Sequence, residues 1–388
     1  MVVRILLLSP FFSPNVGGVE THLDDVCRAL GRRGHEVEVM TYQPLTTRVK
    51  GAGVERRPGV TIRRWPWIRG NFFHVFEAFP PIQFLYLVPG LLIASWWRMR
   101  RARGSIQVIF AHGLAAGWIG TVLKKMFHVP LVVSIHAVYN FDGRGGLGKQ
   151  VADILKSADG VLCLSRQSQR EFEQIGLEPR RVSVFSYWVD QERFRPMDQA
   201  LCQERTQLRA KLVVLFVGRM IAIKGMDVML DVARRLKDQD VLFAFAGDGP
   251  EAGRVKSTAA ELPNVRFIGR VSNDDLPAYY NAADVTVVPS QYEEGYGRVI
   301  LESLSCGTPV FATRRGGVPE ALDETVGRLM DPTSANFFKV LEEVRASRSM
   351  LEALAARSRA YAEAKFSERN VEAIERGLKQ AVEDRSLS

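Results

Sequence analysis

Short apolar runs alternate along the chain with longer amphipathic stretches. Ten runs have the length and the aliphatic and β-branched content of buried strands: residues 3–8, 37–42, 106–110, 131–135, 160–165, 212–217, 241–246, 265–269, 284–289 and 308–313. Residues 20–34 show helical spacing instead, with apolar side chains on one face at Leu23, Val26, Cys27 and Leu30. Strands that are apolar on both faces and alternate with helices predict parallel sheets covered on both sides.

The ten runs form two blocks, and a polar stretch at residues 190–212 separates them. We therefore predict an α/β fold with two doubly wound domains, one at residues 1–190 and one at residues 205–365. In such domains the loops at the carboxyl ends of the strands bind the ligand. Residues 366–388 are predicted to form a C-terminal helix, for which packing back on the first domain is one arrangement.

Composition and charge narrow the choice of partners. The chain has 388 residues, of which 46% are hydrophobic and 24% charged, as in a globular protein of about two or three domains. Its net charge of +9 favours nucleic acid, an anionic membrane surface or a phosphorylated substrate. The basic residues are not interleaved with aromatic residues as in single-strand readers, so no nucleic-acid partner is expected. Four widely spaced cysteines indicate neither a disulfide framework nor a zinc site and fit a reducing, cytoplasmic location.

Two of the loops after predicted strands contain candidate phosphate-binding residues. Gly17 and Gly18 follow the first strand and let backbone N–H groups approach a ligand at the start of the next helix, although such a pair is more often only a turn. Arg219 and Lys224 follow the first strand of the second block. They suit a diphosphate, arginine by its planar fork and lysine as a point charge, and a pair of solvated surface charges is the alternative.

Two glutamates flank a predicted helix start in "EEGYGRVILE", residues 293–302. Glu294 lies on the loop after a strand, and residues 295–297 lead into a helix whose first turn presents free N–H donors. Glu294 can accept hydrogen bonds from sugar hydroxyls, and Glu302 can reach a second pair of hydroxyls such as those of a ribose. In the alternative interpretation one glutamate caps the helix and the other is solvated on its face.

Six motifs in one order give the pattern a family resemblance. They are "GGVE" (17–20), "GRMIAIKG" (218–225), "AGDGPE" (246–251), "FIGRVSNDDLPAYYNAADVTVVPS" (267–290), "EEGYGRVILESLSCGTPV" (293–310) and "GGVPE" (316–320). Together they resemble a retaining GT-B glycosyltransferase of family 4 over nearly the whole chain. The resemblance implies two Rossmann-like domains that face each other across a cleft, with the acceptor bound by the first and a nucleotide-sugar donor by the second.

The resemblance implies how the nucleotide is bound. Arg219 and Lys224 would neutralise its diphosphate as the bond between the sugar and the phosphate breaks. Glu302 would bind the ribose, and the backbone around Val271 would meet the base. The nucleotide would be GDP, UDP or ADP, and the sequence does not choose among them.

The resemblance also implies how the transferred sugar is held. Glu294 would contact it together with the amides of the next three residues, Gly295, Tyr296 and Gly297. His136, after the strand at 131–135, would reach the same sugar, although a lone histidine at a strand end is most often structural. Gly17 and Gly18 would close over the phosphates beside the acceptor. The predicted catalytic residues are therefore Glu294, His136, Arg219 and Lys224.

The implied reaction moves a hexose-type sugar to an acceptor hydroxyl, on a glycan or a lipid-linked molecule, with retention of anomeric configuration. Without an obvious nucleophile such a transfer is drawn as a front-face displacement, in which the leaving phosphate takes the acceptor proton. A sugar-nucleotide epimerase or a phosphorylase-like enzyme on the same architecture is the alternative, since fold does not imply function. Neither cofactor nor metal is expected, because the Asp-x-Asp triplet at 238–240 precedes a strand and lies at the wrong end for a ligand.

Two positions depart from the family pattern. The first domain of the family often ends in Asn-Gly-Val-Asp, whereas this chain has Tyr187 and Trp188 in "SYWVD", which suggests an unusual acceptor side. Arg298 replaces the more common aliphatic or amide residue after Gly297. It either adds a cation near the donor or is a solvated group at the start of the helix.

Residues 65–104 raise the question of a membrane. The apolar core from Ile82 to Trp97 is shorter than the roughly 20 residues that span a bilayer and is interrupted by Pro89, so a transmembrane helix is not expected. Tryptophans followed by arginines suit the headgroup boundary of an anionic leaflet, which would place the protein peripherally on the inner face of the membrane. The alternative is a core helix of the first domain with a basic, solvated end.

Overall fold

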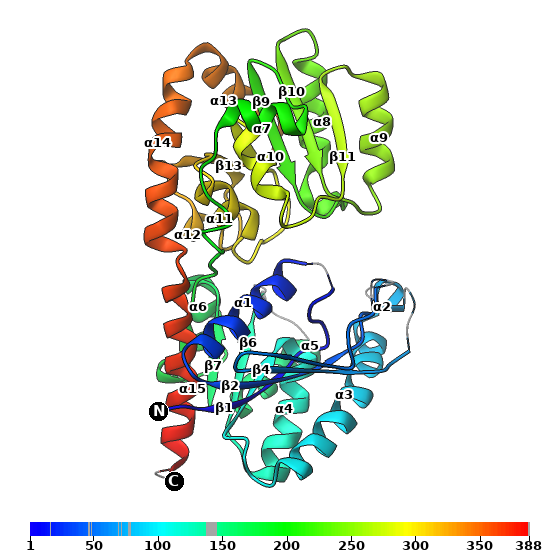
Figure 1. The fold of residues 1–388 in the computed structure, drawn as a ribbon, viewed down its shortest axis with the longest axis vertical. Helices are drawn as coiled ribbons and strands as arrows, with labels where there is room; N and C mark the ends of the chain where they lie inside the picture. The colour runs from blue at the N-terminus through cyan, green and yellow to red at the C-terminus, as the bar shows by residue number, and fades with distance from the viewer. Residues whose placement is uncertain are drawn as a thin grey trace. The chain divides into compact units, whose positions relative to one another are not determined.

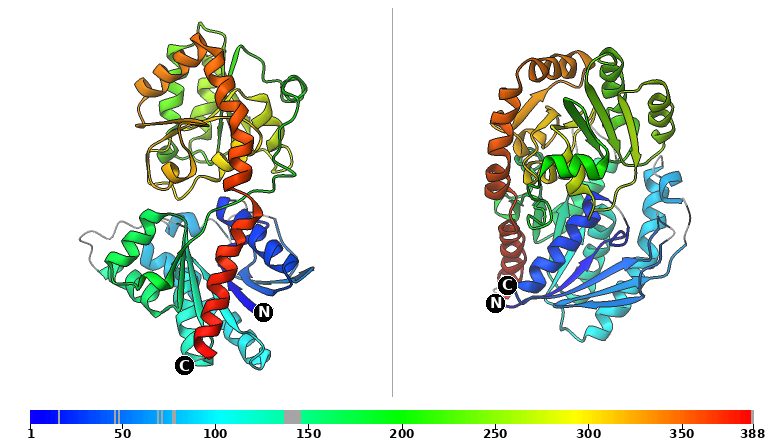
Figure 2. Two further views of the ribbon diagram at one scale, coloured as in Figure 1. Left: turned by 90° about the vertical axis from the view of Figure 1, so that its left-hand side faces the viewer. Right: turned by 45° about the horizontal axis from the view of Figure 1, so that its top comes forward.

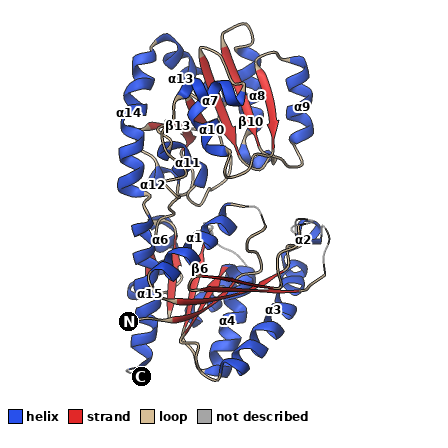
Figure 3. Cartoon of the chain, in the orientation of Figure 1, coloured by secondary structure: helices blue, strands red, loops and turns tan. Residues whose placement is uncertain are grey.

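The chain folds into two compact units, each with its own sheet. The structure is a computed structural model that describes residues 1–15, 17–45, 47, 49–68, 70, 72–76, 79–136 and 146–386. The first unit comprises Met1–Phe185 and Arg369–Ser388, and the second comprises Ser186–Glu368. In each unit helices cover both faces of the sheet (Figures 1 and 3).

The first unit contains an eight-stranded sheet in the order β3-β4-β2-β1-β5-β6-β7-β8, parallel except for the antiparallel pair β3–β4. Its strands are β1 (Arg4–Leu8), β2 (Glu36–Tyr42), β3 (Val54–Arg57), β4 (Val60–Trp65), β5 (Val108–His112), β6 (Leu131–Ile135), β7 (Gly160–Cys163) and β8 (Val182–Val184). Its helices are α1 (Gly18–Arg32), α2 (Phe72–Phe76), α3 (Pro80–Ala102), α4 (Gly113–Phe127), α5 (Gly146–Ser157), α6 (Arg166–Gln174) and α15 (Val371–Ser386). The strand order reverses between β1 and β5.

The second unit contains a six-stranded parallel sheet in the order β11-β10-β9-β12-β13-β14. Its strands are β9 (Leu212–Val217), β10 (Val241–Ala246), β11 (Val265–Gly269), β12 (Val285–Val288), β13 (Val310–Thr313) and β14 (Gly327–Met330). Its helices are α7 (Gln199–Thr206), α8 (Met226–Arg235), α9 (Ala252–Glu261), α10 (Leu276–Ala282), α11 (Arg298–Ser305), α12 (Val318–Ala321), α13 (Ser334–Ala346) and α14 (Arg348–Lys365). The strand order reverses between β9 and β12, so a ligand is expected at the carboxyl ends of these two strands.

The predicted fold class, two doubly wound α/β domains, is confirmed. Every one of the ten apolar runs overlaps a strand, and β9, β10 and β11 have the predicted bounds. The helix predicted at 20–34 is α1, which buries the four apolar side chains on its inner face. Both sheets bury their strands between helices, which is why the runs are apolar on both faces.

The boundary between the units lies at residues 185 and 186, whereas the sequence placed the end of the first domain at residue 190. The segment that follows is bound to the second unit by the side chain of Arg359 on α14. Its guanidinium donates to the carbonyl oxygens of Gln191 at 3.2 Å, Phe194 at 2.8 Å and Ser305 at 2.9 Å. Three carbonyls thus share one cation, and the polar stretch after residue 190 is packed structure rather than a free linker.

Helix α15 is the last element of the chain and packs on the first unit, against α1 and the strands from β5 to β8 (Figure 2). Glu375 anchors it, accepting from Arg33 Nε at 2.6 Å and from His35 Nε2 at 3.0 Å. Val3 N donates to the other ring nitrogen of His35, which leaves the proton on Nε2. Burial alone would raise the pKa of Glu375, but its hydrogen bonds to Lys379, His35 and Arg33 lower it to about 2.

A lowered carboxyl pKa stabilises the fold above the ordinary pKa of 4.5, and this contribution is lost as the pH falls toward 2. We expect Glu375→Gln to lower the free energy of unfolding at pH 7 by on the order of 3 kcal/mol. The difference between the variant and the wild type should shrink steadily below pH 4.5. Urea unfolding of both proteins from pH 7 to pH 3 measures it, and a difference that stays constant with pH would contradict the assignment.

Helix α3 has two apolar faces. One face is buried in the first unit, at Leu87, Leu91, Ala94 and Met99. The other face is exposed, at Ile82, Leu85, Ile93 and Trp97. None of the described helices is both long enough and apolar enough to cross a membrane. The core-helix interpretation of residues 65–104 therefore holds for one face of α3, and the exposed face needs its own explanation.

Candidate active site

Two loops of the second unit meet where the strand order reverses. The loop at 218–225 follows β9, and the loop at 289–297 follows the adjacent strand β12. Gln291 N donates to Ile223 O at 2.8 Å and ties the two loops together. Arg219, Lys224 and Glu294 therefore lie at one edge of one sheet, although they are up to 75 residues apart in sequence.

Glycines let these backbones approach one another closely. Gly225 has φ +73°, and a Cβ atom there would lie 1.9 Å from the carbonyl oxygen of Pro289. Gly316 has φ +56°, and its Cβ would lie 2.1 Å from the carbonyl oxygen of Glu294. Gly317 N donates to the same carbonyl at 2.8 Å. The loops after β9, β12 and β13 thus form one packed unit of backbone, which fixes the position of Glu294.

Lys224 and Glu294 form an ion pair in this packed unit. Lys224 Nζ lies 2.5 Å from Glu294 Oε1 and 4.9 Å from the centre of the Tyr292 ring. Ser290 Oγ donates to the same carboxylate oxygen at 2.5 Å. Burial by itself would lower the pKa of Lys224, but the negative charge of Glu294 and the contact with Tyr292 outweigh it and raise the pKa. Lys224 therefore remains a cation and holds the buried Glu294 carboxylate in one position.

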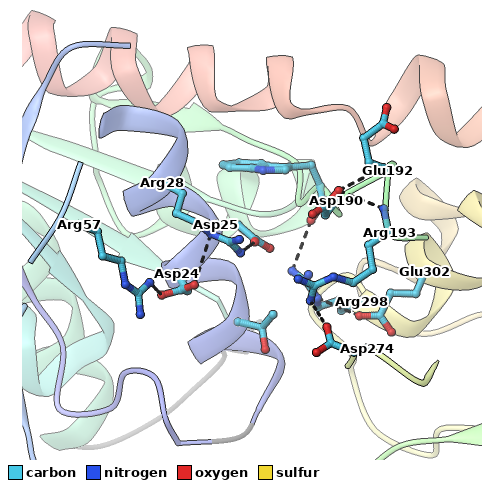
Figure 4. A network of polar contacts seen from close by, with 12 residues as sticks. Asp24, Asp25, Arg28, Arg57, Asp190, Glu192, Arg193, Asp274, Arg298 and Glu302 are labelled. Carbon is cyan, nitrogen blue, oxygen red and sulfur yellow. Dashed lines mark hydrogen bonds and ion pairs between the residues drawn. The ribbon is translucent and has the colours of Figure 1, made fainter. Parts of the chain in front are cut away.

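Glu302 is held by two different donors. Arg298 Nε lies 2.9 Å from Glu302 Oε1 (Figure 4). The hydroxyl of Tyr280 donates to Oε2 at 2.8 Å. The two charged side chains are only 9% and 8% exposed. Neither Arg298 nor Glu302 is solvated. The alternatives in which Arg298 is a solvated group at the start of the helix and Glu302 is solvated on its face are therefore wrong. Burial raises the pKa of Tyr280 well above its ordinary value, which keeps its hydroxyl protonated as a donor.

Helix α11 presents its N-terminus beside Glu294. It begins at Arg298, with Gly297 as N-cap at φ 70°, and within the described structure no side chain caps it. The described hydrogen bonds of the Glu294 carboxylate come from Lys224 and Ser290 rather than from this helix, and in the first turn Ile300 N donates to Gly297 O at 2.8 Å. The side chain of Tyr296 is buried, with its hydroxyl 3.4 Å from Ser186 Oγ and 3.3 Å from Glu320 O. At Tyr296, as at Gly295, a ligand can be bound by the backbone but not by a side chain.

Arg219 and Val271 lie at two other places on the same sheet edge. Arg219 is exposed at the carboxyl end of β9. Val271 follows β11, the edge strand, which β10 separates from β9. It lines a polar hollow of about 170 Å3 with Arg270, Asp275 and other side chains.

In the first unit, Gly17 and Gly18 lie at the start of α1. Gly17 is the residue before the helix, and its carbonyl accepts from Thr21 Oγ1 at 2.9 Å. The carboxyl group of Glu20 packs against Gly17, since a Cβ atom there would lie 2.2 Å from Glu20 Oε2. Burial raises the pKa of Glu20. The Glu20 carboxyl group thus occupies the space beside Gly17 at this helix N-terminus, and the binding of phosphates by Gly17 and Gly18 stays a prediction.

His136 lies at the end of β6, where two polar groups contact its ring. Its Nε2 is 3.2 Å from His112 Nδ1 and 2.9 Å from Ser134 Oγ. Burial lowers the pKa of His136 to about 3, and burial together with His136 lowers that of His112. Both rings are therefore neutral at physiological pH. A neutral imidazole can exchange hydrogen bonds with a sugar but carries no charge to it.

Comparisons with known proteins decide the family. The family described as "Glycosyltransferase Family 4" matches residues 16–193. The family described as "Glycosyl transferases group 1" matches residues 203–361. A D-inositol 3-phosphate glycosyltransferase of Salinispora arenicola is 31% identical over 83% of this chain and 78% of its own length. The chain belongs to the family 4 glycosyltransferases. Its two units are the two Rossmann-like domains of that family's GT-B fold.

Solved structures agree with this fold. A sucrose-phosphate synthase of Thermosynechococcus elongatus aligns over 100% of both chains with a TM-score of 0.81 and 22% identity. The Anabaena protein HepE in complex with UDP-glucose aligns over 99% of this chain and 100% of its own, with a TM-score of 0.76 and 20% identity. At these identities the similarity shows the GT-B fold of this glycosyltransferase and not its substrates.

Sequence reasoning missed several partners of the predicted site residues. They are Tyr280, Ser290 and Tyr292 in the second unit and His112 in the first. Tyr280 and Ser290 belong to a quoted family motif, but nothing in the motif said which glutamate each would contact. The "GGVPE" motif was recognised without a role, and Gly316 and Gly317 now have one, as the backbone support of Glu294.

Proposed function

We propose that this glycosyltransferase moves a hexose-type sugar from a nucleotide sugar to an acceptor hydroxyl with retention of anomeric configuration. The observation that carries the proposal is the Lys224–Glu294 ion pair beside the uncapped N-terminus of α11. Lys224 offers a cation and the start of the helix offers backbone N–H groups to a diphosphate, and Glu294 offers a fixed carboxylate to a polyhydroxylated sugar. The family membership and the strand-end position of the pair support the same assignment.

In the proposed reaction the bond between the anomeric carbon and the phosphate oxygen breaks as a bond to the acceptor oxygen forms on the same face. Lys224 and Arg219 stabilise the negative charge of the leaving diphosphate. Glu294 accepts hydrogen bonds from the sugar hydroxyls while positive charge builds on the ring. The acceptor proton passes to a phosphate oxygen of the leaving group, so that no side chain acts as a base.

The remaining predicted residues have binding roles in this proposal. Glu302 accepts from the ribose hydroxyls, and the backbone at Val271 meets the base. His136 exchanges hydrogen bonds with the transferred sugar as a neutral ring, and Gly17 and Gly18 offer backbone N–H groups to the phosphates.

The function is tested first by donor binding. A donor that binds the native state raises its melting temperature, so a panel of GDP-, UDP- and ADP-sugars identifies the nucleotide. UDP-glucose enters the panel because the HepE complex contains it, and D-inositol 3-phosphate is the first acceptor to try because a relative is named for it. With a labelled donor we expect nucleoside diphosphate and a glycoside. An isomeric sugar nucleotide would instead indicate an epimerase, and sugar phosphate formed from inorganic phosphate would indicate a phosphorylase.

We expect turnover to persist in EDTA. The Asp238–Asp240 triplet lies in the turn before β10, at the amino end of the strand, and Lys224 and Arg219 already supply positive charge to the diphosphate. The measurement is initial rate with excess EDTA and again with added magnesium or manganese. Loss of activity that either metal restores would contradict a metal-independent reaction.

We also propose that the exposed face of α3 rests on an anionic membrane surface and that the acceptor is lipid-linked. Exposed apolar side chains recur along this face, from Ile82 to Trp97. At its end the guanidinium groups of Arg100 and Arg101 lie 5.0 and 5.4 Å from the ring centres of Trp96 and Trp97. Residues 78–141 contain no aspartate or glutamate, so no acidic side chain of this segment would be repelled by the negative charge of the membrane surface.

Flotation with liposomes tests the membrane proposal. The protein should float with vesicles that contain anionic lipid, less so as salt is raised, and not with neutral vesicles. Trp97→Ser with Ile93→Ser should abolish flotation and leave donor binding unchanged, because neither residue lies at the donor site. Absence of flotation at low salt would leave α3 as a core helix with an exposed apolar face.

A further inference from the structure

His112 and His136 lie beside the point where the strand order of the first sheet reverses. His112 is the last residue of β5, and His136 directly follows β6, the next strand of that sheet. The register pairs His112 with Ser134, and Ser134 is two residues from His136, so the three side chains share one face. In doubly wound sheets a ligand binds at the carboxyl ends of the strands beside such a reversal. The two rings therefore stand where the first unit is expected to bind a ligand.

The packing of this place fixes how the His136 ring is turned. Its centre lies 5.5 Å from that of His112, with 29° between the ring planes, and 5.8 Å from that of Phe185, which it meets edge-on. Burial lowers the pKa of both histidines, so both rings are neutral at physiological pH. A neutral imidazole has one N–H group and one nitrogen that accepts. The tautomer of His136 therefore decides which of its nitrogens donates and which accepts.

The contacts of His112 indicate where its own proton lies. Its Nδ1 is 3.2 Å from His136 Nε2, and Ser134 Oγ is 2.9 Å from the same nitrogen. The other nitrogen of His112, Nε2, is buried and has no hydrogen-bond partner among the residues that the structure describes. A proton on Nε2 would be a buried donor without an acceptor, which folded proteins avoid more strictly than an unused acceptor. The proton of His112 is therefore expected on Nδ1, from which it donates to His136 Nε2.

This donation determines the tautomer of His136. Its Nε2 accepts, so its single proton lies on Nδ1, whatever other groups the ring contacts. Ser134 could not impose this state alone, because a hydroxyl group can either donate to Nε2 or accept from it. His112 is the neighbour that can only donate in the arrangement described.

We propose that His112 is a positioning residue that keeps the proton of His136 on Nδ1 and thereby makes His136 a hydrogen-bond donor to the transferred sugar. The inference rests on the proposed function, in which His136 contacts that sugar. Without His112, the proton of His136 could move to Nε2 and be donated to Ser134. His136 would then offer the sugar an acceptor where a donor is required.

Nitrogen-15 NMR of the histidine-labelled protein without ligand tests the tautomer. The chain has six histidines, so single substitutions can assign the signals. His136 should have its proton on Nδ1, and His35 is the internal reference for the opposite tautomer, because Val3 N donates to its Nδ1. His112→Phe should shift the His136 signals toward the Nε2–H form, whereas Ser134→Ala should not. A wild-type His136 with its proton on Nε2, or a tautomer that His112→Phe leaves unchanged, would overturn the proposal.

Turnover measures the consequence of the tautomer. His112→Phe should lower kcat about tenfold, the order expected for one lost hydrogen bond to the sugar, and leave the affinity for nucleoside diphosphate unchanged. His112→Leu is a second probe if the phenylalanine variant does not fold. His112→Asn should restore both the tautomer and most of kcat, because an amide N–H can donate from nearly the position of Nδ1. A kcat that does not follow the His136 tautomer across these variants would overturn the proposed role of His112.

His128→Asn is the matched control. The 15-residue helix α4 begins directly after His112, so His128 at its other end lies about 22 Å away. His128 is exposed and has φ 55°, a conformation that asparagine tolerates. The substitution should leave both kcat and the tautomer of His136 unchanged, and a loss of either would contradict a specific role for His112. If the wild type transfers no sugar, the proposed function fails, whereas the NMR result still decides the tautomer.

Discussion

Glu294→Gln is expected to lower kcat ten- to hundredfold with little change in KM. In the proposed reaction Glu294 contacts the sugar as positive charge develops, so its charge matters more in the transition state than in the ground state. A hydrogen bond to a charged group is worth on the order of 1.5–3 kcal/mol, which corresponds to this range of rates. Donor binding should persist, because Lys224 and the N-terminus of α11 still hold the diphosphate.

Glu302→Gln should differ by raising KM about tenfold or more with kcat nearly unchanged, because the ribose lies away from the bond that breaks. The structure also predicts a loss of stability in this variant, which the sequence did not show. The variant leaves the buried Arg298 with a neutral partner, so its melting temperature should fall as well. Steady-state kinetics and calorimetry on both variants, with circular dichroism to confirm folding, measure these effects. Wild-type kcat and KM in both would show that neither glutamate belongs to the active site.

Gly225→Ala is expected to lower the free energy of unfolding of the second unit by about 2–4 kcal/mol and to abolish most activity. The residue has φ +73°, where a side chain is strained, and its Cβ would lie 1.9 Å from Pro289 O. Relief of that clash must separate the loops after β9 and β12. Because Lys224 precedes Gly225 and Glu294 follows Pro289, the ion pair should open as the loops part.

Gly253→Ala is the control for this substitution. Gly253 lies in α9 without a positive φ, and a Cβ atom there would have open space around it, with none of the described neighbouring atoms within 4 Å. Alanine there should be neutral or stabilise by roughly 0.5–1 kcal/mol, since glycine is a poor helix former. Thermal unfolding and kcat of both variants give the comparison. A Gly225→Ala protein as stable and active as Gly253→Ala would contradict the packed-loop description of the site.

The sequence was most informative where burial on both faces of a strand left an unbroken apolar run. The runs at 212–217, 241–246 and 265–269 match β9, β10 and β11. It did not predict β3, β4, β8 and β14. Three of these, β3, β8 and β14, are short strands at sheet edges, and β4 lies inside its sheet but carries Arg63 and Arg64. An edge strand that is solvated on one side need not be apolar, so its pattern does not stand out from a loop.

The candidate site shows the same division. Strand-end position and motif order identified Lys224 and Glu294 separately, but their contact depends on β9 and β12 being neighbours, which the strand order decides and local sequence does not. For Arg298 the signal was present, because an arginine four residues before a glutamate on a helix is spaced to form an ion pair. What sequence could not give was the burial of that pair and its contact with Trp188.

The proposed reaction is tested most directly by proton NMR of a turnover mixture with a donor labelled with carbon-13 at the anomeric position. With an α-linked nucleotide sugar we predict that the signal of the anomeric proton in the sugar phosphate is replaced by the signal of a glycoside as nucleoside diphosphate accumulates. The glycoside signal should have the small coupling between H1 and H2 that marks an α-linkage. A product of β configuration, or label that remains in a sugar nucleotide with an altered ring, would contradict retaining transfer by this site.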